Sequence, residues 1–237
     1  MNVLLVGGSG MVGSMTLPFL KDELQLRVFD RVSPASEDVE YLQGDVKDPA
    51  AVAKAVEGMD AVIYMVMQPL DQYEDVQLCY DLNVTGLYQV LHCAHKNGIR
   101  RAVYISSGSV YDYRYDFYHS EDMPFDAPDE YGITKWFGER VSEWFCRCHG
   151  MTICSLRLFS PRTRSDWLEV RRDEMTFRAA GTQDSDVARA ILLALECPIT
   201  GFHPVFISGD HEGKHINLSR ARELLGWEPL ARPDETG

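Results

Sequence analysis

The sequence contains no long hydrophobic run and no pair of cysteines in CxxC spacing. Its longest apolar run, Ala61–Met67, is far shorter than the roughly 20 residues that a membrane-spanning helix needs. The 6 cysteines are scattered without a CxxC pair, which is typical of a reduced, cytoplasmic protein. Cys146 and Cys148 lie two residues apart on a predicted helix and do not face each other, so no metal site is expected. Met1–Val6 already resembles a strand, and we expect no signal peptide.

Positively charged residues are few. Lys and Arg number 23 against 36 Asp and Glu, which gives a formal net charge of −13. This charge repels phosphate backbones and anionic lipid, so we expect no nucleic acid and no membrane surface as a partner. The chain has no internal repeats and no low-complexity segments. Its 237 residues, 45% of them hydrophobic, are enough for a full core without a metal or a disulfide.

Predicted strands and helices alternate through the first two thirds of the chain. The predicted strands are Val3–Val6, Leu26–Asp30, Val39–Gly44, Ala61–Met67, Ala102–Ser107 and Cys154–Phe159. The predicted helices are Met11–Lys21, Pro49–Val56 after an Asp48 cap, Val84–Lys96 after an Asn83 cap, and Tyr131–His149. Almost continuously apolar strands that alternate with helices predict a Rossmann-like α/β fold, a doubly wound parallel sheet covered on both faces. After residue 160 we expect a short lobe with helices Asp186–Leu195 and Ser219–Leu225 and a strand Val205–Ser208.

Three glycines, Gly7, Gly10 and Gly13, lie between the first predicted strand and the first predicted helix. One allows a tight turn, one lets the backbone approach a pyrophosphate, and one lets the helix pack closely on the strand. The helix N-terminus then offers free N–H groups to the phosphates. Asp30, at the end of the second strand, can accept hydrogen bonds from both adenosine ribose hydroxyls and repels a 2′-phosphate. The pattern predicts NAD binding, with NADP as the alternative because Arg31 could pair with a 2′-phosphate.

Tyr131 and Lys135 stand four residues apart at the start of a predicted helix, which places the phenol and the ammonium on one face. A tyrosine with a pKa near its usual value of about 10 is a poor base at neutral pH. We expect the ammonium, together with the positive nicotinamide of an oxidised cofactor, to lower that pKa. Ser107, at the end of the fifth strand, can hydrogen-bond a substrate hydroxyl beside Tyr131. The alternative is a surface tyrosine and lysine without a catalytic role.

These motifs resemble those of the extended short-chain dehydrogenases, the NAD-dependent epimerase/dehydratase family. Segments in family order include Gly44-Asp45-Val46, Asn83-Val84-Thr85-Gly86, Ser106-Ser107-Gly108-Ser109-Val110-Tyr111 and Arg157. The resemblance implies that Tyr131 is the acid/base, that Lys135 holds the nicotinamide ribose, and that Ser107 positions the substrate oxygen. It also implies that Asn83 supports the active site, beside its local interpretation as a helix cap. The predicted cofactor-binding residues are Gly7, Ser9, Gly10, Met11, Val12, Gly13, Asp30, Arg31, Asp45, Val46, Met65, Val66, Met67, Asn83, Tyr131, Lys135 and Leu158.

Two features depart from the family pattern. Met65-Val66-Met67 is bulkier than the small residues that the family usually has beneath the cofactor, and it either packs on the cofactor ribose or fills the core. The segment after the sixth strand is short, a layout similar to that of the uronate dehydrogenases. That resemblance implies that Ser160 and either Arg162 or Arg164 bind the substrate, the arginine taking its carboxylate, with Ser107 and Ser109 nearby. The alternative for the arginines is a solvated loop.

The resulting hypothesis is an NAD-dependent oxidoreductase that removes hydride from a hydroxyl-bearing carbon of a sugar or sugar acid. The alternatives are a nucleotide-sugar epimerase or dehydratase that retains its NAD, and a non-catalytic NAD-binding redox sensor. On this hypothesis residues 1–160 form the NAD-binding domain with the catalytic residues. Residues 161–237 form a short substrate-binding lobe packed on the sheet within the same structural unit. Surplus apolar residues on the helices at 84–96 and 131–149 predict a homodimer.

Overall fold

The computed structural model describes residues 1–68, 74–112, 119–171 and 181–232. Its centre is a seven-stranded sheet in the order β3-β2-β1-β4-β5-β6-β7, and every neighbouring pair of strands is parallel. The strands are β1 (Asn2–Val6), β2 (Gln25–Asp30), β3 (Glu40–Gln43), β4 (Ala61–Tyr64), β5 (Arg101–Ser107), β6 (Thr152–Leu158) and β7 (Phe202–Ile207). This is the predicted Rossmann-like sheet, and the strand predicted at Val205–Ser208 in the lobe, here β7, joins it as a further parallel strand.

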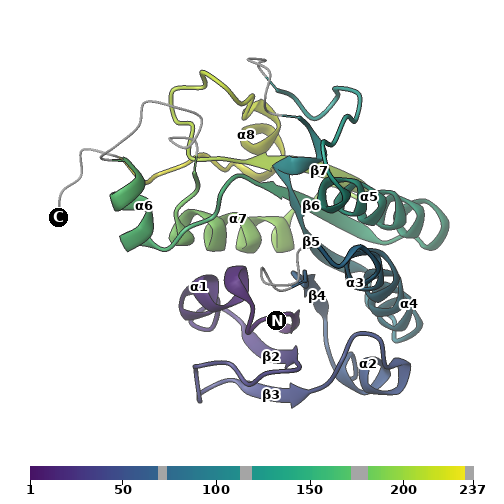
Figure 1. The fold of residues 1–237 in the computed structure, drawn as a ribbon. Coiled ribbons are helices and arrows are strands. Elements are labelled where there is room, and N and C mark those ends of the chain that lie inside the picture. The colour runs from purple at the N-terminus through teal and green to yellow at the C-terminus, as the bar shows by residue number, and fades with distance from the viewer. Residues whose placement is uncertain (69–73, 113–118, 172–180, 233–237) are drawn as a thin grey trace.

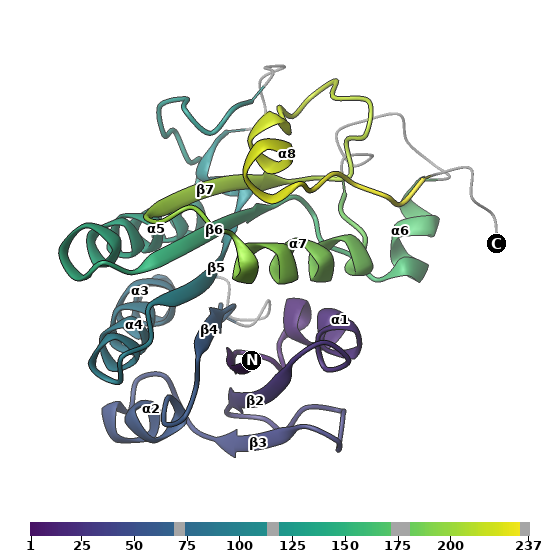
Figure 2. The same cartoon turned by 180° about the vertical axis from the view of Figure 1, so that it is seen from behind.

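Helices cover both faces of the sheet (Figures 1 and 2). On one face lie α1 (Met11–Leu20) and α7 (Asp184–Glu196), which pack on each other, and α8 (Ser219–Leu225) packs beside β7. On the other face lie α2 (Pro49–Ala55), α3 (Val76–Tyr80), α4 (Leu87–Lys96) and α5 (Glu130–His149). Successive strand residues alternate between the two cores, as Val3 and Leu5 join one apolar cluster and Leu4 and Val6 the other. The near-continuous apolar strands are therefore explained by burial on both sides.

The helical run before β5 differs from its prediction. α3 continues through a π-helical turn, η2 (Asp81–Gly86), directly into α4, so Asn83 lies inside the run. Asn83 is therefore not a helix cap, and its side-chain amide instead donates to Thr134 Oγ1 at 2.9 Å. The cap of α3 is Asp75, whose carboxylate accepts from the backbone N–H of Leu78. π-helical turns are rare and occur often at functional sites.

The segment after β6 supplies α6 (Arg164–Arg171), α7, β7 and α8. α6 was not predicted, and β7 begins three residues earlier than the predicted strand. β7 pairs with β6 from Ile153↔Phe202 to Leu158↔Ile207, so this part of the chain extends the sheet. Among the described residues, no helix is long and apolar enough to cross a membrane.

Candidate active site

A hollow of about 310 Å³ opens at the carboxyl ends of β1, β2, β3 and β4. It lies where the strand order reverses between β1 and β4, the place where this fold binds nucleotides. Twelve of the predicted cofactor residues line it: Gly7, Ser9, Gly10, Met11, Val12, Asp30, Arg31, Asp45, Val46, Met65, Val66 and Met67. The lining also includes residues that the sequence did not single out, namely Phe29, Val32, Gly44, Gln68 and Leu82.

The surroundings of each glycine in the turn explain why a side chain is absent there. Gly7 has φ +84°, and a Cβ there would lie 2.9 Å from the backbone nitrogen of Val66. A Cβ on Gly13 would lie 2.4 Å from the carbonyl oxygen of Gly8, so α1 packs directly on the turn. A Cβ on Gly10 would meet only the Gly7 carbonyl, at 3.3 Å, which leaves this position open for the close approach of a ligand. α1 has no side-chain cap and no acidic residue in its first turn, so its free N–H groups fit a phosphate.

Asp30 is held at the end of β2 by the glycine turn. Its carboxylate accepts from the backbone N–H of Ser9 at 3.0 Å and of Val32 at 3.2 Å. Each carboxylate oxygen retains further lone pairs, so Asp30 can still accept hydrogen bonds from ribose hydroxyls. Arg31 also lines the hollow, and its carbonyl accepts from Gln43. These residues fit the adenosine end of a dinucleotide.

Ser107, Tyr131 and Lys135 meet at the ends of β5 and α5, beyond β4. A Cβ on Gly132 would lie 2.0 Å from the carbonyl oxygen of Ser109, so the first turn of α5 lies directly against the segment after β5. This approach brings Tyr131 within hydrogen-bond reach of the Ser107 hydroxyl. Lys135 Nζ lies 5.7 Å from the centre of the Tyr131 ring. The three residues thus form one cluster, as the sequence predicted.

The two titrating groups of this cluster have perturbed pKa values. Burial raises the pKa of Tyr131 to about 12, although the hydrogen bond from Ser107 acts in the opposite direction. Burial also lowers the pKa of Lys135 to about 8. Without a bound cofactor the tyrosine pKa is thus raised, mainly by desolvation, and the lowering expected with a positive nicotinamide stays a prediction. The Lys135 Nζ, 5.7 Å from the ring centre, donates to the Ile105 carbonyl at 3.0 Å.

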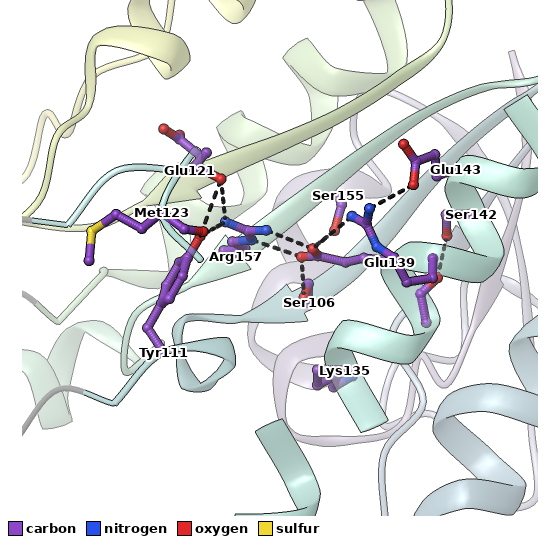
Figure 3. A network of polar contacts seen from close by, with 12 residues as sticks. Ser106, Tyr111, Glu121, Met123, Lys135, Glu139, Ser142, Glu143, Ser155 and Arg157 are labelled. Carbon is purple, nitrogen blue, oxygen red and sulfur yellow. Dashed lines mark hydrogen bonds and ion pairs between the residues drawn. The ribbon is translucent and has the colours of Figure 1, made fainter. Parts of the chain in front are cut away.

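A buried ion pair that the sequence did not reveal lies one turn beyond Lys135 (Figure 3). Arg157 of β6 donates to Glu139 of α5 through Nε at 2.9 Å and Nη2 at 2.7 Å. Glu139 also accepts from Ser106 at 2.9 Å and from Ser155 at 3.2 Å. Burial alone would lower the pKa of Arg157, but the hydrogen bonds and charge of Glu139 raise it above its usual value. This network connects α5 to β5 and β6. Its β5 member is Ser106, which directly precedes Ser107.

Asn83 belongs to a buried polar cluster that contacts α5. Its amide nitrogen donates to Thr134 Oγ1 and to the Cys79 sulfur, 3.3 Å away. Cys79 Sγ itself lies 3.1 Å from Thr134 Oγ1. The η2 turn thereby contacts the helix between Tyr131 and Lys135, although Asn83 does not line the hollow.

The predicted substrate residues follow β6, whose Leu158 pairs with Ser107 of β5. Ser160 has φ +37°, a left-handed conformation that non-glycine residues adopt at a cost and that occurs often at ligand sites. Arg162 is held by a backbone hydrogen bond from its N–H to the Thr182 carbonyl, and its Nε is buried with no partner among the described residues. Arg164 is exposed at the start of α6. Of the two arginines, Arg162 is the less exposed, and it is the one with a buried, unpaired Nε among the described residues.

Comparison with known proteins identifies the family. Residues 3–166 match the NAD dependent epimerase/dehydratase family. The chain is 32% identical over 145 residues to N-acetyl-alpha-D-glucosaminyl-diphospho-ditrans,octacis-undecaprenol 4-epimerase of Escherichia coli O157:H7, covering 61% of this chain and 44% of the relative. It is 24% identical to L-arabinose 1-dehydrogenase (NAD(P)(+)) of Haloferax volcanii, covering 96% and 95%.

The fold is also that of solved structures. The crystal structure of uronate dehydrogenase from Agrobacterium tumefaciens superposes with a TM-score of 0.80 at 22% identity, covering 98% of this chain and 85% of that one. The chain spans about half the length of the epimerase and of several other curated relatives that it matches. The glycine turn, the site cluster and the matched residues agree: the chain belongs to the NAD dependent epimerase/dehydratase family, whose members are NAD-dependent enzymes.

Proposed function

We propose that this protein is an NAD-dependent dehydrogenase that oxidises a hydroxyl-bearing carbon of a sugar or sugar acid. The cluster of Ser107, Tyr131 and Lys135 beside the nucleotide hollow carries the proposal. When bound, NAD supplies the hydride acceptor. The glycine turn and Asp30 would hold its pyrophosphate and adenosine ribose.

In the proposed reaction Ser107 holds the substrate hydroxyl by a hydrogen bond. Tyr131, as phenolate, removes the proton of that hydroxyl. Without substrate the Ser107 hydroxyl donates to the Tyr131 oxygen, and on substrate binding it donates to the substrate oxygen instead. Lys135 adds positive charge below the ring when it is protonated. Burial of Tyr131 favours the neutral phenol, so bound cofactor with its positive nicotinamide is needed to bring the tyrosine pKa toward neutrality.

We infer that Arg162 binds a substrate carboxylate, with Ser160 beside it. A guanidinium holds a carboxylate through two parallel hydrogen bonds, and the Nε of Arg162 has no partner in the described part of the chain. Similarity to L-arabinose 1-dehydrogenase along almost the whole chain, and to the fold of uronate dehydrogenase, supports a small sugar or sugar acid as substrate.

The test is absorbance of reduced nicotinamide after adding NAD to a panel of uronic acids, neutral sugars and nucleotide-sugars. Tyr131→Phe should lower the rate about 10²–10⁴-fold, the usual contribution of an acid/base group. Arg162→Met should raise KM for acidic sugars and leave KM for neutral ones unchanged, and Arg164→Met tests the alternative arginine. No NAD reduction with any substrate would contradict the dehydrogenase.

An epimerase with retained NAD is the second candidate, favoured by the similarity to a 4-epimerase over 61% of the chain. It would produce an epimeric sugar without net reduction of added NAD. Chromatography of the products from the same panel separates the two activities.

We also propose that the protein forms a homodimer through α4 and α5. Tyr88, Phe137 and Trp144 on these helices are exposed by 44%, 38% and 37%, which is unusual for large aromatic residues. Tyr88 and Trp144 lie with ring centres 6.3 Å apart, so the two helices present one aromatic surface. Sedimentation should show a dimer at micromolar concentration that Trp144→Glu dissociates, whereas a monomeric wild type would contradict this.

A further inference from the structure

Gln68 is a buried amide that has no hydrogen-bond partner among the residues that the structure describes. The residue is 1% exposed, and neither its Oε1 nor its Nε2 bonds any atom of residues 1–68, 74–112, 119–171 or 181–232. More than nine tenths of buried polar groups in native proteins are hydrogen-bonded, because an unpaired one destabilises the fold. An unpaired buried glutamine therefore needs an explanation, and a bound ligand that pairs with it is one.

The position of Gln68 indicates what that could be. The residue follows β4 and lines the nucleotide hollow with Gly7, Val66 and Met67. β4 lies between β1, which carries the glycine turn, and β5, which ends at Ser107. The carboxyl ends of parallel strands share one edge of the sheet, so Gln68 stands between the phosphate-binding turn and the catalytic cluster.

A dinucleotide on this edge has its adenosine at β2 and β3, where Asp30 and Asp45 line the hollow. Its diphosphate and second ribose then lie toward β4 and β5. An amide can donate two hydrogen bonds and accept two, which suits the oxygens of a diphosphate or a ribose. Gln68 lacks the charge to hold a phosphate by attraction alone, so its contribution would be directional hydrogen bonds.

We propose that the Gln68 amide hydrogen-bonds the nicotinamide half of the cofactor, at its diphosphate or at the ribose next to the nicotinamide. This inference rests on the proposed function, since it assumes that the hollow holds NAD. The unpaired Gln68 amide then destabilises the free protein. In the complex with NAD the same amide is hydrogen-bonded and contributes to the binding free energy.

The test compares Gln68→Leu with the wild type and with Gln25→Leu. Gln25 is exposed at the amino end of β2, on the opposite edge of the sheet, and makes a matched control. Gln68→Leu should raise the Tm of the free protein by about 2–4 °C, because it removes an unpaired buried amide. It should also weaken NAD binding in calorimetric titration about tenfold, the effect of one or two lost hydrogen bonds. Gln25→Leu should do neither, and Gln68→Met replaces the leucine variant if that one does not fold.

Titration of the wild type and the Gln68 variants with ADP-ribose, ADP and AMP locates the contact on the cofactor. The Gln68 variants should bind ADP-ribose more weakly than the wild type does, as they do NAD, and should bind AMP equally well. A loss with ADP assigns the contact to the diphosphate, whereas a loss with ADP-ribose alone assigns it to the ribose.

Wild-type affinity for NAD in both Gln68 variants would overturn the proposal, as would a lower Tm or an equal loss with AMP. Failure of the wild type to bind NAD would instead contradict the proposed function.

Discussion

Replacing Glu139 by glutamine should destabilise the protein by about 3–5 kcal/mol, because breaking a buried ion pair leaves a charge without compensation. Glu139 is fully buried and Arg157 is 4% exposed. The amide keeps an oxygen that can accept from Ser106 and Ser155, whose hydroxyls bond the same carboxylate oxygen. The loss is therefore mainly that of the negative charge opposite a guanidinium that stays protonated. In a protein of this size it corresponds to a Tm lowered by about 6–20 °C.

Urea unfolding of four variants tests this reasoning. Arg157→Met alone should also be destabilising, because it leaves the carboxylate buried without its partner. The double variant Glu139→Gln/Arg157→Met should be more stable than the sum of the single effects by about 2 kcal/mol or more. Glu143→Gln is the matched control on the same helix: its pair with Arg140 is half exposed, so its loss should stay within about 1 kcal/mol. If Glu139→Gln were no more harmful than Glu143→Gln, or the two effects simply added, the buried pair would not hold α5 in place.

Lys135→Met should be more stable than the wild type by about 3 kcal/mol below pH 8, since burial lowers the pKa of Lys135 from 10.5 to about 8. The difference should shrink between pH 8 and 10.5, where the folded lysine is neutral and the unfolded one still charged; a constant difference in urea unfolding would contradict it. For the wild type, kcat/KM for NAD, which reports the enzyme before the cofactor binds, should rise with pH from 7 to 9, because the pKa of Tyr131 is about 12 in that state. A flat profile would show that Tyr131 is not the base. Asp30→Ser should weaken NAD about tenfold and improve NADP relative to NAD, as the carboxylate repels a 2′-phosphate. An unchanged ratio of the two dissociation constants would place the adenosine ribose elsewhere.

Much of the fold and of the nucleotide hollow follows from local pattern. The glycine spacing, the apolar strands and Asp30 each depend on one strand or one turn, and the structure brings them together as the sequence predicted. The cluster of Tyr131 and Lys135 was predictable for the same reason, since residues spaced four apart on a helix lie on the same face.

Features that depend on packing between distant segments were not predictable. Arg157 is the one charged residue of β6 and Glu139 follows Gly138 on a helix, but their pairing depends on how α5 crosses β6. The raised pKa of Tyr131 depends on its burial, and the backbone of Ser160 on contacts of the segment after β6 with residue 182. Gln68 could have been singled out as a polar residue directly after an apolar strand, yet only the structure shows that none of the described residues pairs with it.

The π-helical turn at 81–86 determines how α3 is rotated about the helix axis relative to α4. One residue of an α-helix turns the chain by about 100°, so a helix with one residue more or less than its neighbour presents a different face. Deleting a single residue from this turn would let α3 and α4 join as a regular helix. Cys79 would then turn away from Thr134, while α4 could keep its place on the sheet. A change of one residue in this turn would thus alter the support beneath Tyr131 and Lys135 without requiring any change in the sheet.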